Sequence, residues 1–491
     1  MENIYKERLF TYVLLLSLLV VIFLMTFLGL IWGAITNELF FDKINFIAIS
    51  SFFVFVGICV ISLASTNLYF VFLIFQIIAF PATIDNLIPG TYFGDQTELN
   101  ASITPLFTHI DLFILLGIIK GVIKRNKLIL VNSRLLTLSV LILFASSFVN
   151  IFYSRNTQDF LLIISGFMHL RYLIGIYLLF SIYDPGNYSK QILNGFVISV
   201  IFLFIEALIF TKINGVDRLT SGTLGNNSFG NIIACITIYF IFVSKLKISY
   251  SYQVILSITI AIGIITVVLS QTRMALISGF VLFIIGTFYH SRKSFVAVLY
   301  LMLIFFVIVS SVMFSSVYET DLAKRFDIVR VVSKIHLSLP WSDNNMIEIE
   351  PSVETASLLT RLKLYDTSTN MIVDNPIFGI GSMRWDYYKG EYGFEEEILL
   401  DTHNGYLAVI SQFGIFAITF IYLIYLWPIK ILKNKSILRD SNVYLALITL
   451  GMAICDLSNA GIYKHQIFAL LSLNVIVLIH TANRKTTYKY E

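Results

Sequence analysis

The sequence predicts an all-α polytopic membrane protein with about 14 transmembrane helices and one large extracytoplasmic loop that contains short helices. Hydrophobic residues make up 57% of the 491 residues and charged residues only 13%, a balance typical of a protein that exposes apolar surface to lipid. The apolar residues occur in long runs. Only the region 315–402 interrupts them at length, and it holds 15 of the 30 acidic residues.

The apolar runs divide into fourteen predicted spans. The first follows Lys6 and Arg8 and is long enough to cross a bilayer; since no small-residue cleavage site follows, we interpret it as an uncleaved span. The predicted limits are 9–32, 44–64, 67–83, 105–123, 135–152, 160–182, 192–211, 227–243, 251–270, 274–290, 294–314, 403–427, 442–460 and 464–481. Within one integral membrane domain, this gives an N-terminal bundle of about eleven spans at 1–314, the loop at 315–402, and about three spans at 403–491.

Basic residues alternate between the loops in the manner of the positive-inside rule. They gather at 120–127, 190, 245–247, 292–293 and 430–439 and in the tail at 484–489, while the short loops between hold fewer. This predicts that both termini are cytoplasmic and that the large loop is periplasmic or extracellular.

Several functional classes find no support in the sequence. The net charge of +4 is small, and no basic block or zinc spacing indicates nucleic-acid binding. The glycines near 222–230 and 379–381 follow no predicted strand, and there is no Walker sequence. The three cysteines lie in apolar stretches and are interpreted as core residues. We expect no cofactor, although Glu38 and Asp42 in the first outer loop leave a divalent ion open.

Two helices are expected in the large loop. The first is amphipathic and suits a membrane surface; the second ends before the breaker Asn375-Pro376. Their apolar faces are expected to consist of Leu322, Phe326, Val329 and Val332 in the first helix and Leu358, Leu362 and Tyr365 in the second.

His403 is the strongest candidate for chemistry, because it lies where the loop returns to an apolar span. Asp401 and Thr402 are good N-cap residues, which places His403 in or just before the first helical turn. The helix dipole disfavours an imidazolium there, and a neutral imidazole can accept a proton from a hydroxyl. Asn404 could orient a sugar. The alternative is a capping or interfacial histidine.

Three arginines are predicted on the same side of the membrane as His403. Arg218 opens a loop that ends at Asn227, Arg273 lies in a tight turn between two spans, and Arg361 lies in the large loop. The planar guanidinium fork suits a diphosphate at this depth. The alternative for each arginine is an interface anchor.

Arg171 lies beside His169 inside the sixth predicted span. An arginine at that depth needs a partner or a water-filled cavity. We interpret it either as a cavity residue or as half of a structural pair with Glu206 or Asp456.

Together these elements resemble the bacterial O-antigen ligase and O-antigen polymerase superfamily of membrane glycosyltransferases. The resemblance covers about residues 218–427 and rests on order and spacing. Its elements are the Arg218 loop, the turn Thr272-Arg273-Met274, the turn Asn375-Pro376-Ile377-Phe378-Gly379-Ile380-Gly381, and His403-Asn404-Gly405-Tyr406-Leu407 followed by Gln412-Phe413-Gly414.

The resemblance implies a GT-C-like bundle in the bacterial cytoplasmic membrane that transfers a glycan from undecaprenyl diphosphate. His403 would activate the acceptor, Arg218 and Arg273 would hold the diphosphate, and no metal would be needed. The acceptor would be a second lipid-linked repeat unit in a polymerase of O-antigen, capsule or exopolysaccharide, or lipid A-core in a lipopolysaccharide ligase. A chain-length regulator and a flippase would be partners. A lipid-linked oligosaccharide flippase is the alternative from another class, since fourteen spans also suit a transporter.

Overall fold

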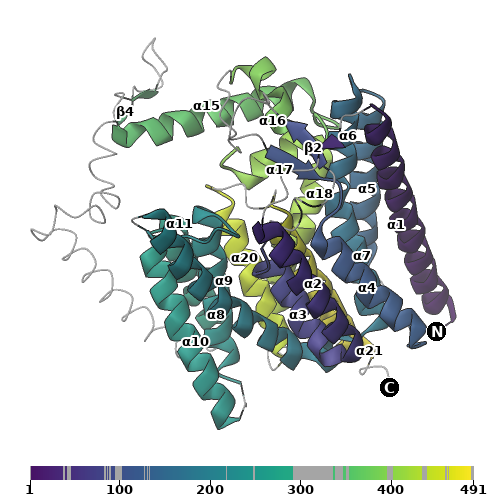
Figure 1. Ribbon diagram of the computed structural model, residues 1–491, viewed down its shortest axis with the longest axis vertical. Helices are drawn as coiled ribbons and strands as arrows, with labels where there is room; N and C mark the ends of the chain where they lie inside the picture. Colours follow the sequence, from purple (N-terminus) through teal and green to yellow (C-terminus); the bar gives the residue numbers. More distant parts are fainter. Residues whose placement is uncertain are drawn as a thin grey trace, which may run out of the picture.

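The computed structural model is a bundle of helices with a few short strands (Figure 1). The residues it describes are 2–36, 39–40, 46–81, 85, 87, 90–93, 102–126, 128–129, 131, 133–216, 218–246, 249–290, 335–337, 347–349, 353–394, 402–433, 440–458, 462 and 464–487. The predicted eleventh span at 294–314, the amphipathic stretch at 322–332 and Glu38 and Asp42 lie outside them.

Among the described residues, the first half of the chain supplies the nine helical segments named below and one small sheet. The helical segments are α1 (Glu2–Thr36), α2 (Phe46–Ala64), α3 (Thr66–Ile78), α4 (His109–Ile123), α5 (Arg134–Ile151), α6 (Thr157–Gly166), α7 (Met168–Ile182), η2 (Pro185–Tyr188) and α8 (Ser189–Asn214). The antiparallel strands β1 (Leu39–Phe40), β2 (Gly90–Phe93) and β3 (Ser102–Pro105) pair in that order, with Leu39 opposite Thr91 and Tyr92 opposite Ile103.

The second half is more broken. Its elements are α9 (Asn226–Val243), α10 (Tyr250–Ser270), α11 (Arg273–His290), β4 (Ile335–Leu337), β5 (Ile347–Ile349), α15 (Val353–Asp374), α16 (Trp385–Tyr388), η3 (Lys389–Tyr392), α17 (Gly405–Phe413), η4 (Gly414–Phe416), α18 (Ala417–Ile421), the π-helical η5 (Tyr422–Leu426), α19 (Trp427–Leu432), η6 (Ser441–Tyr444), α20 (Leu445–Cys455) and α21 (His465–Thr487). Strands β4 and β5 pair antiparallel, with His336 opposite Glu348.

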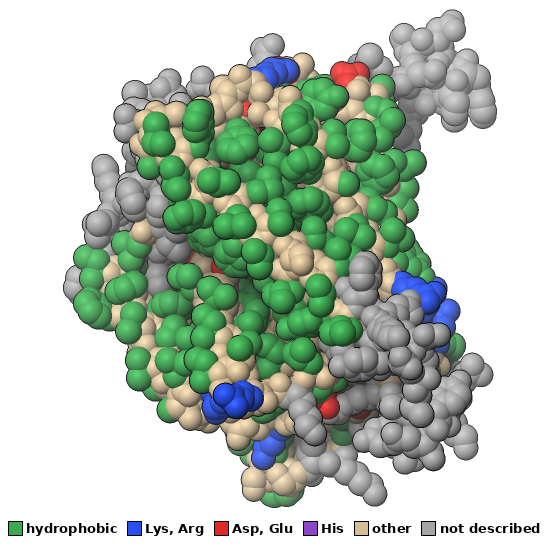
Figure 2. All heavy atoms as spheres, turned by 90° about the vertical axis from the view of Figure 1, so that its right-hand side faces the viewer, with side chains coloured by type: hydrophobic (Ala, Val, Ile, Leu, Met, Phe, Trp, Pro, Cys, Tyr) green, Lys and Arg blue, Asp and Glu red, His purple; other side chains and the backbone are tan. Residues whose placement is uncertain are grey.

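The helices have the length and surface of a multi-pass membrane protein. Among the described residues, 8 helical segments are long and apolar enough to cross a membrane, and four apolar helices are shorter. Hydrophobic side chains cover most of the face drawn in Figure 2, where charged ones are few. The prediction of multiple membrane helices is therefore confirmed, whereas the count of fourteen and the extent of the large loop remain predictions.

The core of the first half is built around α7. All fifteen residues of this helix are buried, and it packs against α1, α4 and α21. The sixth predicted span, 160–182, is in fact two helices, because α6 ends at Gly166 and α7 begins at Met168.

The predicted span 403–427 is also interrupted. Gly414 ends α17 with a φ of 60°. A Cβ at Gly414 would lie 2.3 Å from the Ile377 carbonyl oxygen. Glycine is therefore required where the loop before α17 crosses its end, and the helical path continues through η4, α18, η5 and α19.

The described part of the large loop has a small apolar core of its own. Leu364 and Met371 of α15 pack with residues of the following turns. The helix ends at Asp374, just before Pro376, as predicted. However, the buried face of α15 includes Leu364 and not Leu362, which is 37% exposed. The remaining members of this cluster are Ile380, Trp385, Tyr388 and Phe394.

Candidate functional site

His403 lies just before the first turn of α17, in the position predicted. Its φ is 48°, a left-handed conformation that costs a non-glycine residue about 1–3 kcal/mol and that recurs at functional sites. The predicted N-cap was wrong, because Asn404 has that role. Its side chain accepts hydrogen bonds from the backbone N–H groups of Tyr406 and Leu407, both at 3.0 Å. Asn404 is thus occupied by capping rather than free to orient a sugar.

The backbone around His403 is bound to the end of α20. The Gly405 N–H donates to the Asp456 carbonyl at 2.7 Å. The Asn404 side-chain amide donates to the Leu457 carbonyl at 3.3 Å. The Tyr406 hydroxyl donates to the Ala453 carbonyl at 2.8 Å, so Tyr406 positions this segment. The left-handed turn that carries the imidazole is therefore held in place by the end of α20.

Helix α15 lies over this turn. The Tyr365 hydroxyl donates to the His403 carbonyl at 3.5 Å, at the long limit of a hydrogen bond. Arg361 is four residues earlier, so it shares a face of the helix with Tyr365. The Arg361 side chain is half-buried, and its Nε is enclosed with no hydrogen-bond partner among the described residues. Arg361 thus lies one helical turn before the residue of α15 that contacts the His403 turn.

The glycine-rich turn after α15 connects α15 to the end of α17. The N–H groups of Ile380 and Gly381 donate to the carbonyls of Ser411 and Gln412 at 2.9 and 3.0 Å. The Met383 N–H donates to the Gln412 side chain at 2.6 Å. Gly379 has a φ of 68°, and a Cβ there would lie 2.2 Å from the Gln412 carbonyl carbon. These residues are therefore structural, and they hold α15 over His403.

Arg218 and Arg273 form a second group. The Leu219 N–H donates to the Leu269 carbonyl at 3.0 Å, which joins the Arg218 loop to the turn before Arg273. Arg273 is exposed in the first turn of α11, while Arg218 and Asn227 are half-buried. The loop itself is stabilised by Glu206, whose carboxylate accepts the Gly222 N–H at 2.8 Å.

Helix α20 connects the two groups. Its last residue, Cys455, lies against Cys235 of α9, which also meets Ser278 of α11. Arg273 is five residues before Ser278, or about 7.5 Å along the helix. Both groups therefore lie at one end of the bundle, which we call the His403 end. The described contacts do not join Arg218 or Arg273 directly to His403.

Arg171 is not part of this site. Its guanidinium donates to both carboxylate oxygens of Asp111, at 3.1 and 3.0 Å, and to the Leu106 carbonyl at 2.7 Å. Both side chains are buried, so the pair neutralises itself inside the bundle. The predicted partners Glu206 and Asp456 were wrong, and the structural interpretation of Arg171 is the one supported.

A second buried ion pair escaped prediction. Arg384 donates to both oxygens of Asp159 at 2.5 Å, and the Tyr388 hydroxyl donates to the same carboxylate at 2.9 Å. Since 225 residues separate Arg384 from Asp159, no local motif could reveal the pair. The only available signal was an acidic residue at the start of an apolar span.

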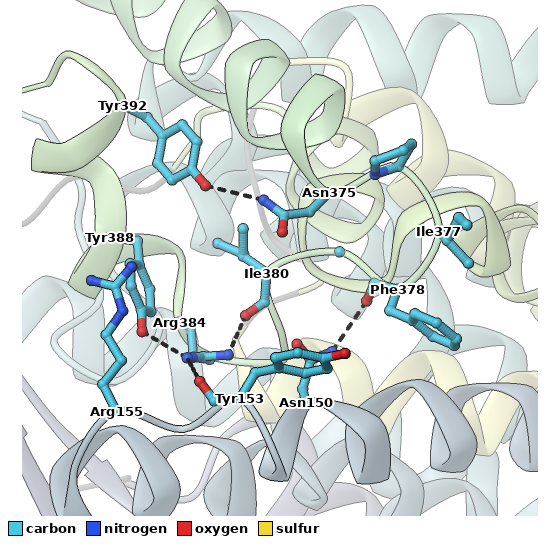
Figure 3. Close-up of a pocket in the computed structure, with 12 residues that line it drawn as sticks. Asn150, Tyr153, Arg155, Asn375, Ile377, Phe378, Ile380, Arg384, Tyr388 and Tyr392 are labelled. Atoms are coloured by element: carbon cyan, nitrogen blue, oxygen red, sulfur yellow. Dashed lines mark hydrogen bonds between the residues drawn. The ribbon is translucent and has the colours of Figure 1, made fainter.

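A pocket of about 450 Å³ opens beside this pair (Figure 3). Asn150, Tyr153, Tyr388 and Tyr392 line it together with the 375–380 turn. Figure 3 shows the Tyr392 hydroxyl directed at Asn375 across its rim. Burial raises the pKa of Tyr388 to about 12.

Both arginines of the pocket are already paired with a carboxylate. Arg384 is bound to Asp159, and Arg155 makes two hydrogen bonds to Glu391, at 2.5 and 3.0 Å. The amides and phenol rings that remain are uncharged. Among the described residues, the site better suited to an anionic ligand is therefore the one around Arg361 and His403.

The comparison with protein families agrees with this choice. Residues 258–422 match the family model described as O-antigen ligase (Wzy_C). The matched segment contains Arg273, Arg361 and His403 and excludes Arg218 and Arg171. No curated protein matches the chain. The resemblance expected from the motifs is thus confirmed, and the chain is a multi-pass membrane protein that is similar over residues 258–422 to the O-antigen ligase family.

Proposed function

We propose that the protein polymerises undecaprenyl-diphosphate-linked repeat units of a surface polysaccharide at the outer face of the bacterial cytoplasmic membrane. The observation that carries this proposal is the contact between α15 and the His403 turn inside the matched family segment. The same helix carries the half-buried Arg361 one turn before Tyr365, and His403 has an unusual backbone conformation with a φ of 48°. In the proposed orientation both termini are cytoplasmic and the His403 end faces outward.

In the proposed step, the His403 imidazole accepts the proton of an acceptor hydroxyl. The hydroxyl oxygen attacks the anomeric carbon of the donor, and the bond from that carbon to the diphosphate oxygen breaks. Undecaprenyl diphosphate leaves with the bonding electrons, and arginine side chains stabilise its developing charge. The glycosyl diphosphate is already activated, so the step needs neither ATP nor a metal ion. A single displacement inverts the anomeric configuration.

The assignment of the arginines follows from their surroundings. Arg361 lies on α15 one turn from Tyr365, the residue that contacts the His403 turn, while Arg273 and Arg218 lie at the same end of the bundle in the second group. Asn404, Tyr406 and Asn227 have supporting positions. The flippase alternative does not require an imidazole fixed in this way at one end.

Ligase activity is the second candidate, because the matched family model is described as O-antigen ligase. In that case the acceptor is lipid A-core, and each donor glycan is transferred once. The two activities share the donor and the proposed roles of His403 and the arginines. They differ only in the hydroxyl that His403 deprotonates.

Reconstitution in liposomes separates the candidates. The protein is supplied with a lipid-linked repeat unit, with or without lipid A-core, and the products are sized. A ladder of lengthened lipid-linked glycans without lipid A-core supports the polymerase; a product only with lipid A-core supports the ligase. Transport of intact donor with no new glycosidic bond would refute both. Proton NMR of the product must show the inverted anomer, since retention would exclude single displacement.

A further inference from the structure

A buried cluster of two histidines and an aspartate lies outside the proposed transfer site. It comprises Asp85, which precedes β2, His109, the first residue of α4, and His465, the first residue of α21. These residues are far apart in the chain, and no motif marks them. One nitrogen of each ring and one carboxylate oxygen all lie within 4.8 Å of one another.

The spacing of these atoms fits the first coordination shell of a small metal ion. His109 Nδ1 lies 3.1 and 3.2 Å from the two carboxylate oxygens of Asp85, and His465 Nε2 lies 3.4 Å from one of them. Ligands bound to Zn²⁺ at their usual distances in a tetrahedron are about 3.3 Å apart. Both imidazoles therefore direct a nitrogen at the same carboxylate with suitable separations.

The hydrogen bonds around the cluster prepare it for this role. His109 Nε2 lies 3.1 Å from the Gln76 carbonyl. A carbonyl only accepts, so Nε2 carries the proton, as is usual for a histidine that binds a metal through its other nitrogen. The His109 backbone N–H donates to Asp85 at 2.7 Å and orients the carboxylate.

Among the three residues of the cluster, His465 is the most exposed. His109 is fully buried with Phe80 and Phe55 against its ring, whereas His465 is 21% exposed. An ion could therefore enter past His465 and keep a water molecule as its fourth ligand. Two imidazoles and one carboxylate favour Zn²⁺ and similar first-row ions over Mg²⁺, which prefers oxygen ligands.

We propose that Asp85, His109 and His465 form a binding site for one divalent first-row transition-metal ion, with Zn²⁺ as the probe. The site joins the starts of α4 and α21. Lys464, beside His465, donates to the Leu224 carbonyl at 3.2 Å, so the ion also steadies the loop that carries Arg218. It has a positioning role and takes no part in glycosyl transfer, and its existence does not depend on the proposed function.

The test uses the full-length protein in detergent. After chelation and dialysis it is titrated with Zn²⁺, and bound metal is measured by mass spectrometry. We expect one equivalent of Zn²⁺ and a rise in Tm, with no rise for Mg²⁺. Substitution of Co²⁺ should give the visible absorption of a four-coordinate site with nitrogen and oxygen ligands.

Variants assign the ligands. Asp85→Asn, His109→Gln and His465→Gln should each lower bound Zn²⁺ at least tenfold. His480→Gln is the matched control, since it removes another buried histidine of α21 that lies far along the helix, and it should retain one equivalent. Wild-type protein that binds no Zn²⁺ would overturn the proposal whether or not the variants fold, and would leave the cluster as a His109–Asp85 ion pair. Equal binding by wild type and His465→Gln would also overturn it.

Discussion

Two sets of arginines at the His403 end differ in what surrounds them. Arg384 is buried, and Asp159 accepts two of its hydrogen bonds. Arg361 is half-buried on α15, one turn from Tyr365, and its Nε has no partner among the described residues. A buried guanidinium that is neutralised by a carboxylate fixes the structure, whereas a half-exposed guanidinium can bind an anionic ligand. The surroundings of an arginine, more than its place in the sequence, therefore indicate its role.

The largest expected effect is on the rate of polymer formation, and it comes from replacing His403. His403→Gln keeps a polar side chain but removes the proton acceptor, so the rate of polymer formation should fall about 10²–10⁴-fold. The rate is measured in the liposome assay, with size-exclusion profile and Tm as controls for folding. A rate within twofold of wild type would remove His403 from the proposed step.

Arg384→Met should affect stability rather than chemistry. It leaves Asp159 charged and buried, and we expect a loss of about 3–5 kcal/mol in the free energy of unfolding. The control is Arg155→Met, which breaks an ion pair whose side chains are 57% and 49% exposed and should cost less than about 1 kcal/mol. Equal losses in the two variants would break the distinction between the two sets of arginines.

Arg361→Ala should lower activity rather than stability, in contrast to Arg384→Met. Loss of charge-assisted hydrogen bonds to a diphosphate, about 1.5–3 kcal/mol, predicts a decrease of roughly 10–100-fold in kcat/KM for the lipid-linked donor, with little change in Tm. Arg361→Lys should restore part of the activity, because it keeps the charge but not the planar fork. If Arg361→Ala instead unfolds the protein, Arg361 is structural like Arg384.

The smallest expected effect is on the stability of the fold at alkaline pH. The pKa of Tyr388 is raised by burial to about 12, above its usual value of about 10. The neutral phenol therefore stabilises the fold fully below pH 10, and this contribution is lost as pH rises toward 12. Tyr388→Phe cannot ionise, so its Tm should fall less than that of wild type between pH 9 and 11. Parallel pH profiles would contradict the role of Tyr388 as a donor to Asp159.

The sequence was informative about where helices lie and less so about how they meet. Long apolar runs located the spans because lipid requires them. The break at Gly414 was hidden, because it depends on contact with Ile377, which no apolar run records. Arg171 was correctly identified as needing a partner, but Asp111 could be found only from the packing of α4 on α7.

The candidate site shows the same limit. His403 was singled out because it lies at the junction of a polar loop and an apolar span. The N-cap was assigned at least two residues too early, at Asp401 or Thr402, because Asn404 takes that position and also bonds to Leu457. The approach of Tyr365 to His403 joins segments 38 residues apart, and spacing alone does not predict such contacts.

The attachment of the His403 turn to α20 constrains how this protein can be altered. A Cβ on Gly405 would lie 2.8 Å from the Asp456 side chain, so the two positions must change together. A chimera that takes residues 402–407 from a homologue should therefore also take the matching end of α20. Grafting the histidine segment by itself would place an intact motif against the end of an α20 that does not match it.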